Sequence, residues 1–306
     1  MQNNTHSYIH DDRNKNIKIY INGKIHERAD AKISVFDSGF LLGDGVWEGI
    51  RLHNGQLCFL IEHLNRLYDG AKQLKIKIPY SKNELTQIIY DLIKKNGMHS
   101  HVHIRIIISR GEKITPYQHP SSNVGPISLV IIPEYKIANE SVNNNGIKLA
   151  SVNTIRGTEI NQDPKINSLS KFNCIAACLE GIDKNVDESL MLDINGYVST
   201  CNSTNFFIVK NNQVITSKGK YCLNGVTREN IVKICKEENI DIIKKDFTLE
   251  TTYNADEAFA TGTFAGVIPI IKIDNHTIGN GKKGLLTERL FKLYKNKINQ
   301  LYPNGK

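Results

Sequence analysis

The sequence has no long apolar run. Hydrophobic residues make up 40% of its 306 residues, an ordinary share for a globular protein, yet no stretch approaches the roughly 20 apolar residues of a membrane-spanning helix. The first 16 residues are polar and rich in asparagine, without the apolar centre of a secretory signal. These absences argue against a membrane protein and predict a cytoplasmic one.

Patterned cysteines and metal ligands are also missing. In a long chain that we expect to be cytoplasmic, six cysteines without a CxxC pair do not indicate a disulfide framework. His99, His101 and His103 alternate as on one face of a strand. Because no carboxylate or cysteine of ligand spacing joins them, we expect no metal site.

Signals for nucleotide and nucleic-acid binding are absent as well. Neither a GxGxxG pattern nor a P-loop pattern occurs. The net charge is +8, but the lysines are spread along the chain instead of clustering among aromatic residues, as they typically do on a nucleic-acid-binding face. We therefore expect no nucleic-acid partner, while the modest positive field favours anionic substrates and phosphates.

The sequence does contain a recurring hairpin signal. Short β-rich runs flank Asn22-Gly23, Asn54-Gly55 and Asn195-Gly196, and Asn-Gly supplies the positive φ angles of a tight turn. Helical patterns lie between the hairpins, for example after Ser81, where Glu84 completes a capping-box signature. Hairpins mixed with helices predict an α+β fold with mostly antiparallel sheets, and the length suggests two domains.

Further elements follow from the apolar spacing. The polar stretch Asn139–Gly146 has almost nothing to bury and is interpreted as a linker. Strands are expected at Val102–Ile108, Ile127–Ile132, Ile147–Val152, Ser189–Asp193, Asn205–Val209 and Val214–Thr216, and helices at Ser170–Gly181, Thr227–Asn239 and Leu285–Asn299.

Two turns rich in small residues have the composition of a phosphate site. Gly225-Val226-Thr227 runs directly into a predicted helix, whose unpaired N–H groups and dipole attract phosphate. The Thr227 hydroxyl either caps this helix or donates to a phosphate oxygen. Thr261-Gly262-Thr263-Phe264-Ala265 is a second such turn after a short predicted strand. Spacing alone leaves open whether the two turns meet at one phosphate.

Taken together, these segments resemble the class IV (fold-type IV) aminotransferases that depend on pyridoxal 5′-phosphate, nearest to the branched-chain amino acid aminotransferases. The matches run in the family's order from about Ile17 to Tyr294. They comprise Asp37-Ser38-Gly39-Phe40-Leu41-Leu42-Gly43-Asp44-Gly45-Val46-Trp47-Glu48-Gly49-Ile50-Arg51, Glu62-His63-Leu64-Asn65-Arg66-Leu67, Gly225-Val226-Thr227-Arg228, Ala255-Asp256-Glu257 and Thr261-Gly262-Thr263.

The resemblance implies roles for individual residues. Lys165, after Asp163-Pro164, resembles the Schiff-base lysine that bonds to the cofactor and moves the proton, with Lys171 as a rival for this role. The other residues that the resemblance implies are, for the cofactor phosphate, Arg66, Val226, Thr227 and Thr263, and for the substrate, Trp47, Arg105, Phe264 and Ala265. Trp47 is equally compatible with a place in the core.

One position departs from the family. After the strand Gly196-Tyr197-Val198 the family places a glutamate that pairs with the pyridine nitrogen, and this sequence has Thr200, which we still expect at the cofactor ring. A carboxylate keeps that nitrogen protonated, whereas a hydroxyl supplies no charge. Either transamination is slowed, or the change is a compensated subfamily variation.

The resemblance further implies an architecture and an activity. We expect a homodimer whose subunits have a smaller N-terminal domain (1–135), a linker (136–145) and a larger cofactor-binding domain (146–306). The expected enzyme transfers an amino group between a branched-chain or related aliphatic amino acid and 2-oxoglutarate with ping-pong kinetics. The alternatives are a lyase of the aminodeoxychorismate type and a weakly catalytic protein that binds pyridoxal phosphate.

Overall fold

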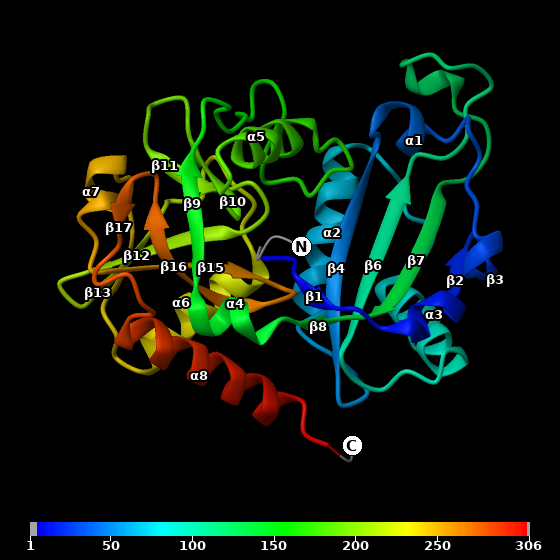
Figure 1. The fold of residues 1–306 in the computed structure, drawn as a ribbon. Helices are drawn as coiled ribbons and strands as arrows, with labels where there is room; N and C mark the ends of the chain where they lie inside the picture. The colour runs from blue at the N-terminus through cyan, green and yellow to red at the C-terminus, as the bar shows by residue number, and fades with distance from the viewer. Residues whose placement is uncertain (1–4, 305–306) are drawn as a thin grey trace. The chain divides into compact units, whose positions relative to one another are not determined.

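The computed structural model describes residues 5–304 and divides them into two units (Figure 1). We call residues 10–137, 166–171 and 302–304 the N-terminal unit. Residues 5–9, 138–165 and 172–301 are the C-terminal unit. Each unit contains its own sheet and its own buried core, as expected for a chain of this length.

Within residues 10–137, six strands form an antiparallel sheet in the order β3-β2-β7-β6-β4-β5. The long central strands carry alternating buried positions, so one face of the sheet is apolar. The strands are β2 Lys18–Ile21, β3 Lys24–Glu27, β4 Gly45–His53, β5 Gln56–Leu57, β6 Val102–Ser109 and β7 Ser128–Tyr135.

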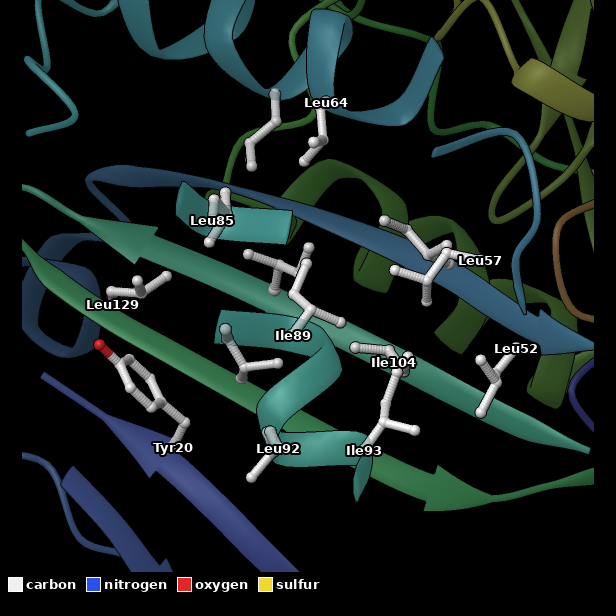
Figure 2. Close-up of a cluster of buried hydrophobic side chains, with 14 of the residues drawn as sticks. Tyr20, Leu52, Leu57, Leu64, Leu85, Ile89, Leu92, Ile93, Ile104 and Leu129 are labelled. Atoms are coloured by element: carbon white, nitrogen blue, oxygen red, sulfur yellow. The ribbon is translucent and has the colours of Figure 1, made fainter. Parts of the chain in front are cut away.

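Two long helices cover that apolar face (Figures 1 and 2). Leu64 of α2 and Leu85 and Ile89 of α3 pack with Leu52 and Ile104 of the strands in one buried cluster. The helices of this unit are α1 Ser38–Leu42, α2 Leu60–Gln73 and α3 Lys82–Lys95, with short 3₁₀ turns at Asp12–Asn16, Arg28–Asp30 and Pro120–Ser122.

Local signals placed these elements correctly. The hairpins at Asn22-Gly23 and Asn54-Gly55 are confirmed, with positive φ at all four residues. The capping box at the start of α3 is confirmed as well, since Ser81 and Glu84 each accept a hydrogen bond from the other's backbone N–H.

The sheet of the C-terminal unit is mixed. Nine strands within residues 147–277 run in the order β11-β10-β9-β16-β15-β12-β13-β14, with β17 on β16. Pairs β9–β10, β9–β16 and β13–β14 are parallel and the others antiparallel. The strands are β9 Ile147–Ser151, β10 Glu188–Leu192, β11 Val198–Cys201, β12 Asn205–Lys210, β13 Gln213–Thr216, β14 Ile242–Lys244, β15 Glu257–Gly262, β16 Gly266–Ile273 and β17 His276–Thr277.

The helices of this unit pack on its sheet. The helices α6 and α8 lie against β15 and against each other, and α5 lies against β9 and β10. A buried cluster that includes Phe206, Ile208 and Phe247 lies on the face of the sheet that carries the even-numbered residues of β12. The helices are α4 Glu140–Asn145, α5 Phe172–Asp183, α6 Val226–Glu237, α7 Leu249–Tyr253 and α8 Leu285–Leu301.

The stretch interpreted as a linker has regular structure, and the chain passes from one unit to the other at its start, between Ile137 and Ala138, so its role as a linker stays a prediction. The residues form the end of β8 (Ile137–Ala138), which pairs with β1 (Tyr8–Ile9), and then α4. Asn139 caps α4 by accepting from the Ser141 N–H, and Val142 is buried in the core of the C-terminal unit. One apolar anchor and a good cap are therefore enough to order an asparagine-rich stretch.

The segment 166–171 returns to the N-terminal unit and runs beside β4. Ser168 bridges to Val46, the Trp47 N–H donates to the Asn167 carbonyl (2.9 Å), and the Leu169 N–H donates to the Gly45 carbonyl (2.9 Å). Lys171 ends this segment and α5 begins at the next residue. Among the helices of residues 5–304, none is long and apolar enough to cross a bilayer.

Candidate active site

Arg66 is fixed by a buried carboxylate of β4. Its Nε donates to Glu48 Oε1 (2.6 Å) and its Nη2 donates to Glu48 Oε2 (2.8 Å), while His63 Nδ1 lies 2.7 Å from the same Oε2. The Glu48 side chain is fully buried, whereas 17% of the Arg66 side chain is exposed. A guanidinium held by two parallel hydrogen bonds has a defined orientation, which suits the binding of an anion.

Charge complementarity keeps Glu48 ionised. Burial alone would raise the pKa of this carboxyl, but the Arg66 charge and the bonds from His63 and Arg66 outweigh it and lower the pKa from 4.5 to about 2. Glu48 is thus an anion at any moderate pH, and it orients Arg66 throughout that range.

Trp47 and Arg105 form a stacked pair on the sheet face that carries odd-numbered residues of β4 and β6. The Arg105 guanidinium carbon lies 4.0 Å from the Trp47 ring centroid. Arg105 is the cross-strand partner of Gly49, where a Cβ would lie 2.9 Å from the His103 ring and 3.6 Å from the Trp47 ring. Burial lowers the pKa of Arg105, and Glu134 partly offsets this effect. The pair combines a partly desolvated cation with an apolar surface.

Asn167 and Lys171 extend the same cluster. Asn167 Nδ2 donates to the Trp47 carbonyl (2.7 Å), and Lys171 Nζ donates to Asn167 Oδ1 (3.0 Å). Lys171 Nζ also lies 5.5 Å from the Trp47 ring centroid. The N-terminal unit therefore brings together Trp47, Arg105 and Lys171, three residues singled out from the sequence.

In the C-terminal unit, α6 begins with an open N-terminus. Gly225 is its N-cap residue, which has no side chain that could cap this end. Val226 and Thr227 are both buried. Thr227 lies inside the helix and is not its N-cap residue, and its other role, as a donor to a phosphate, stays a prediction. The first N–H groups of a helix have no acceptor within the helix, so the start of this twelve-residue helix suits an anion.

A buried hydroxyl lies beside this helix start. Asn205 of β12 donates to the Leu223 carbonyl (2.9 Å), and a Cβ at Gly225 would collide with Asn205 Oδ1. Thr261 of β15 is the cross-strand partner of Asn205, so both side chains project from the same sheet face. Thr261 is 1% exposed, and its hydroxyl has no hydrogen-bond partner among residues 5–304. The end of β15 thus approaches the start of α6.

The second predicted turn follows Thr261 directly. Gly262 pairs with Gly266, and residues 263–265 form the tight turn between β15 and β16. Thr263 lies in this turn, the Phe264 ring stacks on His6 at 6.4 Å, and Ala265 packs against the core of the unit. Thr263, Phe264 and Ala265 are therefore at the same end of the sheet as Thr261.

The Thr200 side chain forms a hydrogen bond within its own hairpin. Its hydroxyl donates to the Thr204 carbonyl (2.7 Å), which also accepts from the Cys201 N–H (3.0 Å). Because the hydroxyl proton is used in this way, the Thr200 oxygen is left as an acceptor only.

Lys165 lies in the loop between β9 and α5. Its Nζ lies 3.3 Å from Glu159 Oε2 and 3.9 Å from Asp163 Oδ2, and 37% of the side chain is exposed. Its backbone N–H donates to Asp163 Oδ1 (2.9 Å). Within the C-terminal unit the described contacts of Lys165 are with these two acids and not with the α6 start. Its role as the covalent lysine stays a prediction.

No metal centre is found in the described part of the chain, where no three His, Cys, Asp or Glu side chains are grouped to hold an ion. The expected alternation of the histidines holds only in part. The strand begins at Val102, so His103 lies on it, whereas His101 has a positive φ in the preceding turn.

A family of known proteins accounts for this arrangement. The sequence model described as "Amino-transferase class IV" matches residues 45–273, which include Glu48, Arg66, Arg105 and the α6 start. The chain belongs to this family. Class IV aminotransferases are transaminases that depend on pyridoxal 5′-phosphate.

Curated relatives support the assignment at the sequence level. "Branched-chain-amino-acid aminotransferase-like protein 2" of Arabidopsis thaliana is 37% identical over 92% of this chain, and the chain spans about half of its length (50%). A "putative branched-chain-amino-acid aminotransferase" of Methanocaldococcus jannaschii is 36% identical, with 91% of this chain and 96% of the relative covered. A "D-alanine aminotransferase" of Staphylococcus haemolyticus is 30% identical over 89% of this chain and 95% of that protein.

Solved structures agree on the fold. The branched-chain amino acid aminotransferase of Escherichia coli has a TM-score of 0.86 at 26% identity, with 92% of this chain and 94% of that chain covered. Other solved branched-chain aminotransferases of similar fold hold N-(5′-phosphopyridoxyl)-L-glutamate or pyridoxamine 5′-phosphate. The predicted α+β, fold-type IV architecture is thereby confirmed.

The residues present fit a phosphate-bearing cofactor. The uncapped α6 start, the orphaned Thr261 hydroxyl and the neighbouring Thr263 turn form a cradle of donors within the C-terminal unit. The expected place of Thr200 at the cofactor ring stays a prediction. Lys165 belongs to the C-terminal unit and Lys171 to the N-terminal unit, and which of them has the covalent role also stays a prediction.

Sequence reasoning missed three residues of these sites. Glu48 has a signal, because a charge at a core-facing position between Val46 and Ile50 requires a buried partner, here Arg66. For Asn167 and Thr261 the sequence contains no such signal, because their contacts are with strand residues that are distant in the sequence.

Proposed function

We propose that this chain is an aminotransferase that moves an amino group between a branched-chain or related aliphatic amino acid and 2-oxoglutarate. The Trp47–Arg105 pair carries the substrate part of the proposal, because it offers a cation for a carboxylate beside an apolar ring. Relatives named as branched-chain aminotransferases support the same substrate class.

Each residue has a defined task in this scheme. The N–H groups of Val226 and Thr227, with the hydroxyls of Thr227, Thr261 and Thr263, bind the cofactor phosphate. Arg66, oriented by Glu48, adds a positive charge for it. The cofactor supplies an aldehyde that takes up the amino group and a ring that withdraws electrons.

The substrate is held by other groups. Arg105 binds a substrate carboxylate, and Trp47 shields the side chain from water. The amides of Phe264 and Ala265 donate to the α-carboxylate. A lysine amine, at Lys165 or Lys171, moves the proton at the substrate α-carbon. Because the amino group is held on the enzyme between two substrates, the kinetics are ping-pong.

The visible spectrum of the protein loaded with pyridoxal 5′-phosphate tests this proposal. We expect a yellow band that L-leucine and L-glutamate each bleach, and that a 2-oxo acid restores. D-Alanine is the informative comparison, since a relative is named for that substrate. A band that none of the three amino acids changes contradicts the proposal.

Thr200 favours a second candidate, a protein that binds the cofactor but catalyses weakly. An acceptor-only hydroxyl leaves the pyridine nitrogen without a charged partner and weakens the electron sink. A bound cofactor that discharges no amino acid would support this candidate. A lyase of the aminodeoxychorismate type would instead release pyruvate without changing the form of the cofactor.

We also propose a homodimer in a reducing compartment such as the cytoplasm. Helix α5 exposes four large apolar side chains at helical spacing, Phe172, Ile175, Leu179 and Ile182, which are 51–78% exposed. An apolar stripe of this kind is suited to burial against a second copy. All six cysteines lie in the described residues as free thiols, which suits a reducing environment.

A further inference from the structure

Phe59, the residue before α2, has an unusual backbone conformation. It is the N-cap residue of the helix, and its φ of 53° and ψ of 36° lie in the left-handed region. Residues with a bulky side chain adopt this conformation at a cost in free energy, and they persist in it only where surrounding contacts hold them. The contacts of Phe59 therefore decide where α2 begins.

Tyr302 and Pro303 hold this turn from a distant part of the sequence. The Phe59 N–H donates to the Tyr302 phenol oxygen (2.7 Å), and the two rings meet edge to face with their centroids 5.8 Å apart. Asn54 Nδ2 donates to the Tyr302 carbonyl (2.9 Å), and Gln56 Nε2 donates to the Pro303 carbonyl (3.1 Å). These bonds join residues 302–303 to the hairpin of β4 and β5 and to the start of α2.

A series of contacts leads from Phe59 to Arg66. The Phe59 carbonyl accepts from the His63 N–H (3.1 Å), which is the first hydrogen bond along α2. His63 Nδ1 lies 2.7 Å from Glu48 Oε2, and the same carboxylate holds the Arg66 guanidinium. Because His63 and Glu48 are both buried among packed side chains, a displaced helix start would disturb their contact and, through it, the orientation of Arg66.

We propose that Tyr302 is a positioning residue for Arg66, an inference that rests on the assignment of Arg66 to the cofactor phosphate. The phenol oxygen holds Phe59 in the left-handed conformation, and α2 then begins where His63 and Arg66 both reach Glu48. Without that oxygen, Phe59 relaxes towards an ordinary φ, which turns the first residues of α2. Tyr302 thus acts through the helix and not by contact with the phosphate.

Tyr90 provides a matched control. Its phenol oxygen accepts from the Leu57 N–H (3.4 Å), in the same hairpin and two residues before Phe59. Leu57 belongs to β5 and does not have a positive φ. Tyr90→Phe therefore removes the same atom from the same hairpin without releasing the strained residue.

Two dissociation constants separate the phosphate site from general stability. Pyridoxal 5′-phosphate and pyridoxal differ only in the phosphate group, so the ratio of their dissociation constants reports on the residues that bind this group. A general loosening of the structure weakens the binding of both and leaves the ratio unchanged. Equilibrium dialysis of the full chain, with circular dichroism to check the fold, gives this ratio for each variant.

Arg66→Gln sets the scale, because it is expected to lower the preference for the phosphate form on the order of tenfold. We expect Tyr302→Phe to lower this preference by about threefold or more, and Tyr90→Phe to leave it unchanged. If Arg66→Gln shows its effect, the inference is overturned by a Tyr302→Phe protein that keeps the full preference or loses both affinities equally. An equal loss of preference in Tyr90→Phe also overturns it. If Arg66→Gln keeps the full preference, or the unsubstituted protein binds no pyridoxal 5′-phosphate, the assignment of Arg66 fails and this inference fails with it.

The substitution Phe59→Gly tests the route through the backbone. Glycine adopts a positive φ without steric strain, so the helix start no longer depends on the phenol oxygen. In that background Tyr302→Phe is expected to have little further effect on the ratio, which is a coupling that a double-mutant cycle measures. An equal effect of Tyr302→Phe in both backgrounds contradicts the proposal. If Tyr302→Phe does not fold, Gln56→Ala, which releases the Pro303 carbonyl alone, takes its place, and an unchanged ratio there counts against the proposal with the same weight.

Discussion

At the scale of the residue, one buried carboxylate couples stability to pH. Glu48 has a pKa of about 2 in the folded chain and an ordinary value of 4.5. Because the folded pKa is depressed, its stabilisation is fully present above pH 4.5 and is lost as the pH falls towards 2. The shift corresponds to about 3 kcal/mol of unfolding free energy.

Urea unfolding at several pH values between 5 and 3 checks this coupling against Glu48→Gln, which has no charge to titrate at that position. The variant is expected to be less stable at pH 5, since Arg66 loses its partner, and to lose less of its remaining stability on acidification. Equal pH slopes for the two proteins would contradict the assigned ion pair.

Asn167 offers a second test at this scale. The substitution Asn167→Asp places a carboxylate 3.0 Å from the Lys171 amine, where it stabilises the ammonium form. If Lys171 is the lysine that gives the yellow band, the pH at which the band titrates is expected to rise by about one unit or more. Asp163→Asn, which removes a carboxylate near Lys165, is the matched control and then leaves the titration unchanged. A shift in Asp163→Asn without one in Asn167→Asp would instead assign the band to Lys165.

At the scale of the element, the phosphate cradle depends on a close approach. Gly225 begins α6 where any Cβ would strike Asn205 Oδ1, so Gly225→Ala is expected to displace the helix start and to weaken cofactor retention at least tenfold. Combining Gly225→Ala with Asn205→Ala removes the obstructing atom and should recover part of the affinity. Unaltered dissociation constants in Gly225→Ala would show that the phosphate binds elsewhere.

Elements with local signals could be predicted from the sequence, and those built from distant contacts could not. The turn at Asn54-Gly55 and the capping box of α3 involve residues at most three positions apart, so their patterns are visible in a single stretch. Asn167 bonds to Trp47 of β4, which lies 120 residues earlier in the chain. No local pattern in either stretch predicts this pairing.

The distinction between local signals and distant contacts also explains which features of the candidate site could be predicted. The turn composition around Thr227 predicted a helix start, and α6 begins there with Gly225 as its N-cap residue. The sequence placed Lys165 beside Pro164 but did not predict that the carboxylates of Glu159 and Asp163 lie near its amine, because those contacts depend on how the loop folds.

At the scale of the whole molecule, the apolar stripe of α5 predicts the oligomer. Leu179→Glu puts a charge in the middle of this stripe, where 56% of the side chain is exposed in the single chain. We expect the substitution to convert a dimer into a monomer in sedimentation velocity at micromolar concentration, because a charge opposite an apolar surface loses its hydration. Lys184→Glu, outside the stripe, is the control. A monomeric unsubstituted protein would refute the dimer.

The central claim is that amino groups pass through this protein from one substrate to another. The most direct measurement follows ¹⁵N from labelled L-leucine to 2-oxoglutarate in the presence of the cofactor-loaded protein. The account predicts labelled glutamate, formed with parallel-line kinetics when both substrates are varied. Absence of labelled glutamate from a protein that retains the cofactor and is folded would contradict the proposed aminotransferase, and would leave a cofactor-binding protein with other chemistry.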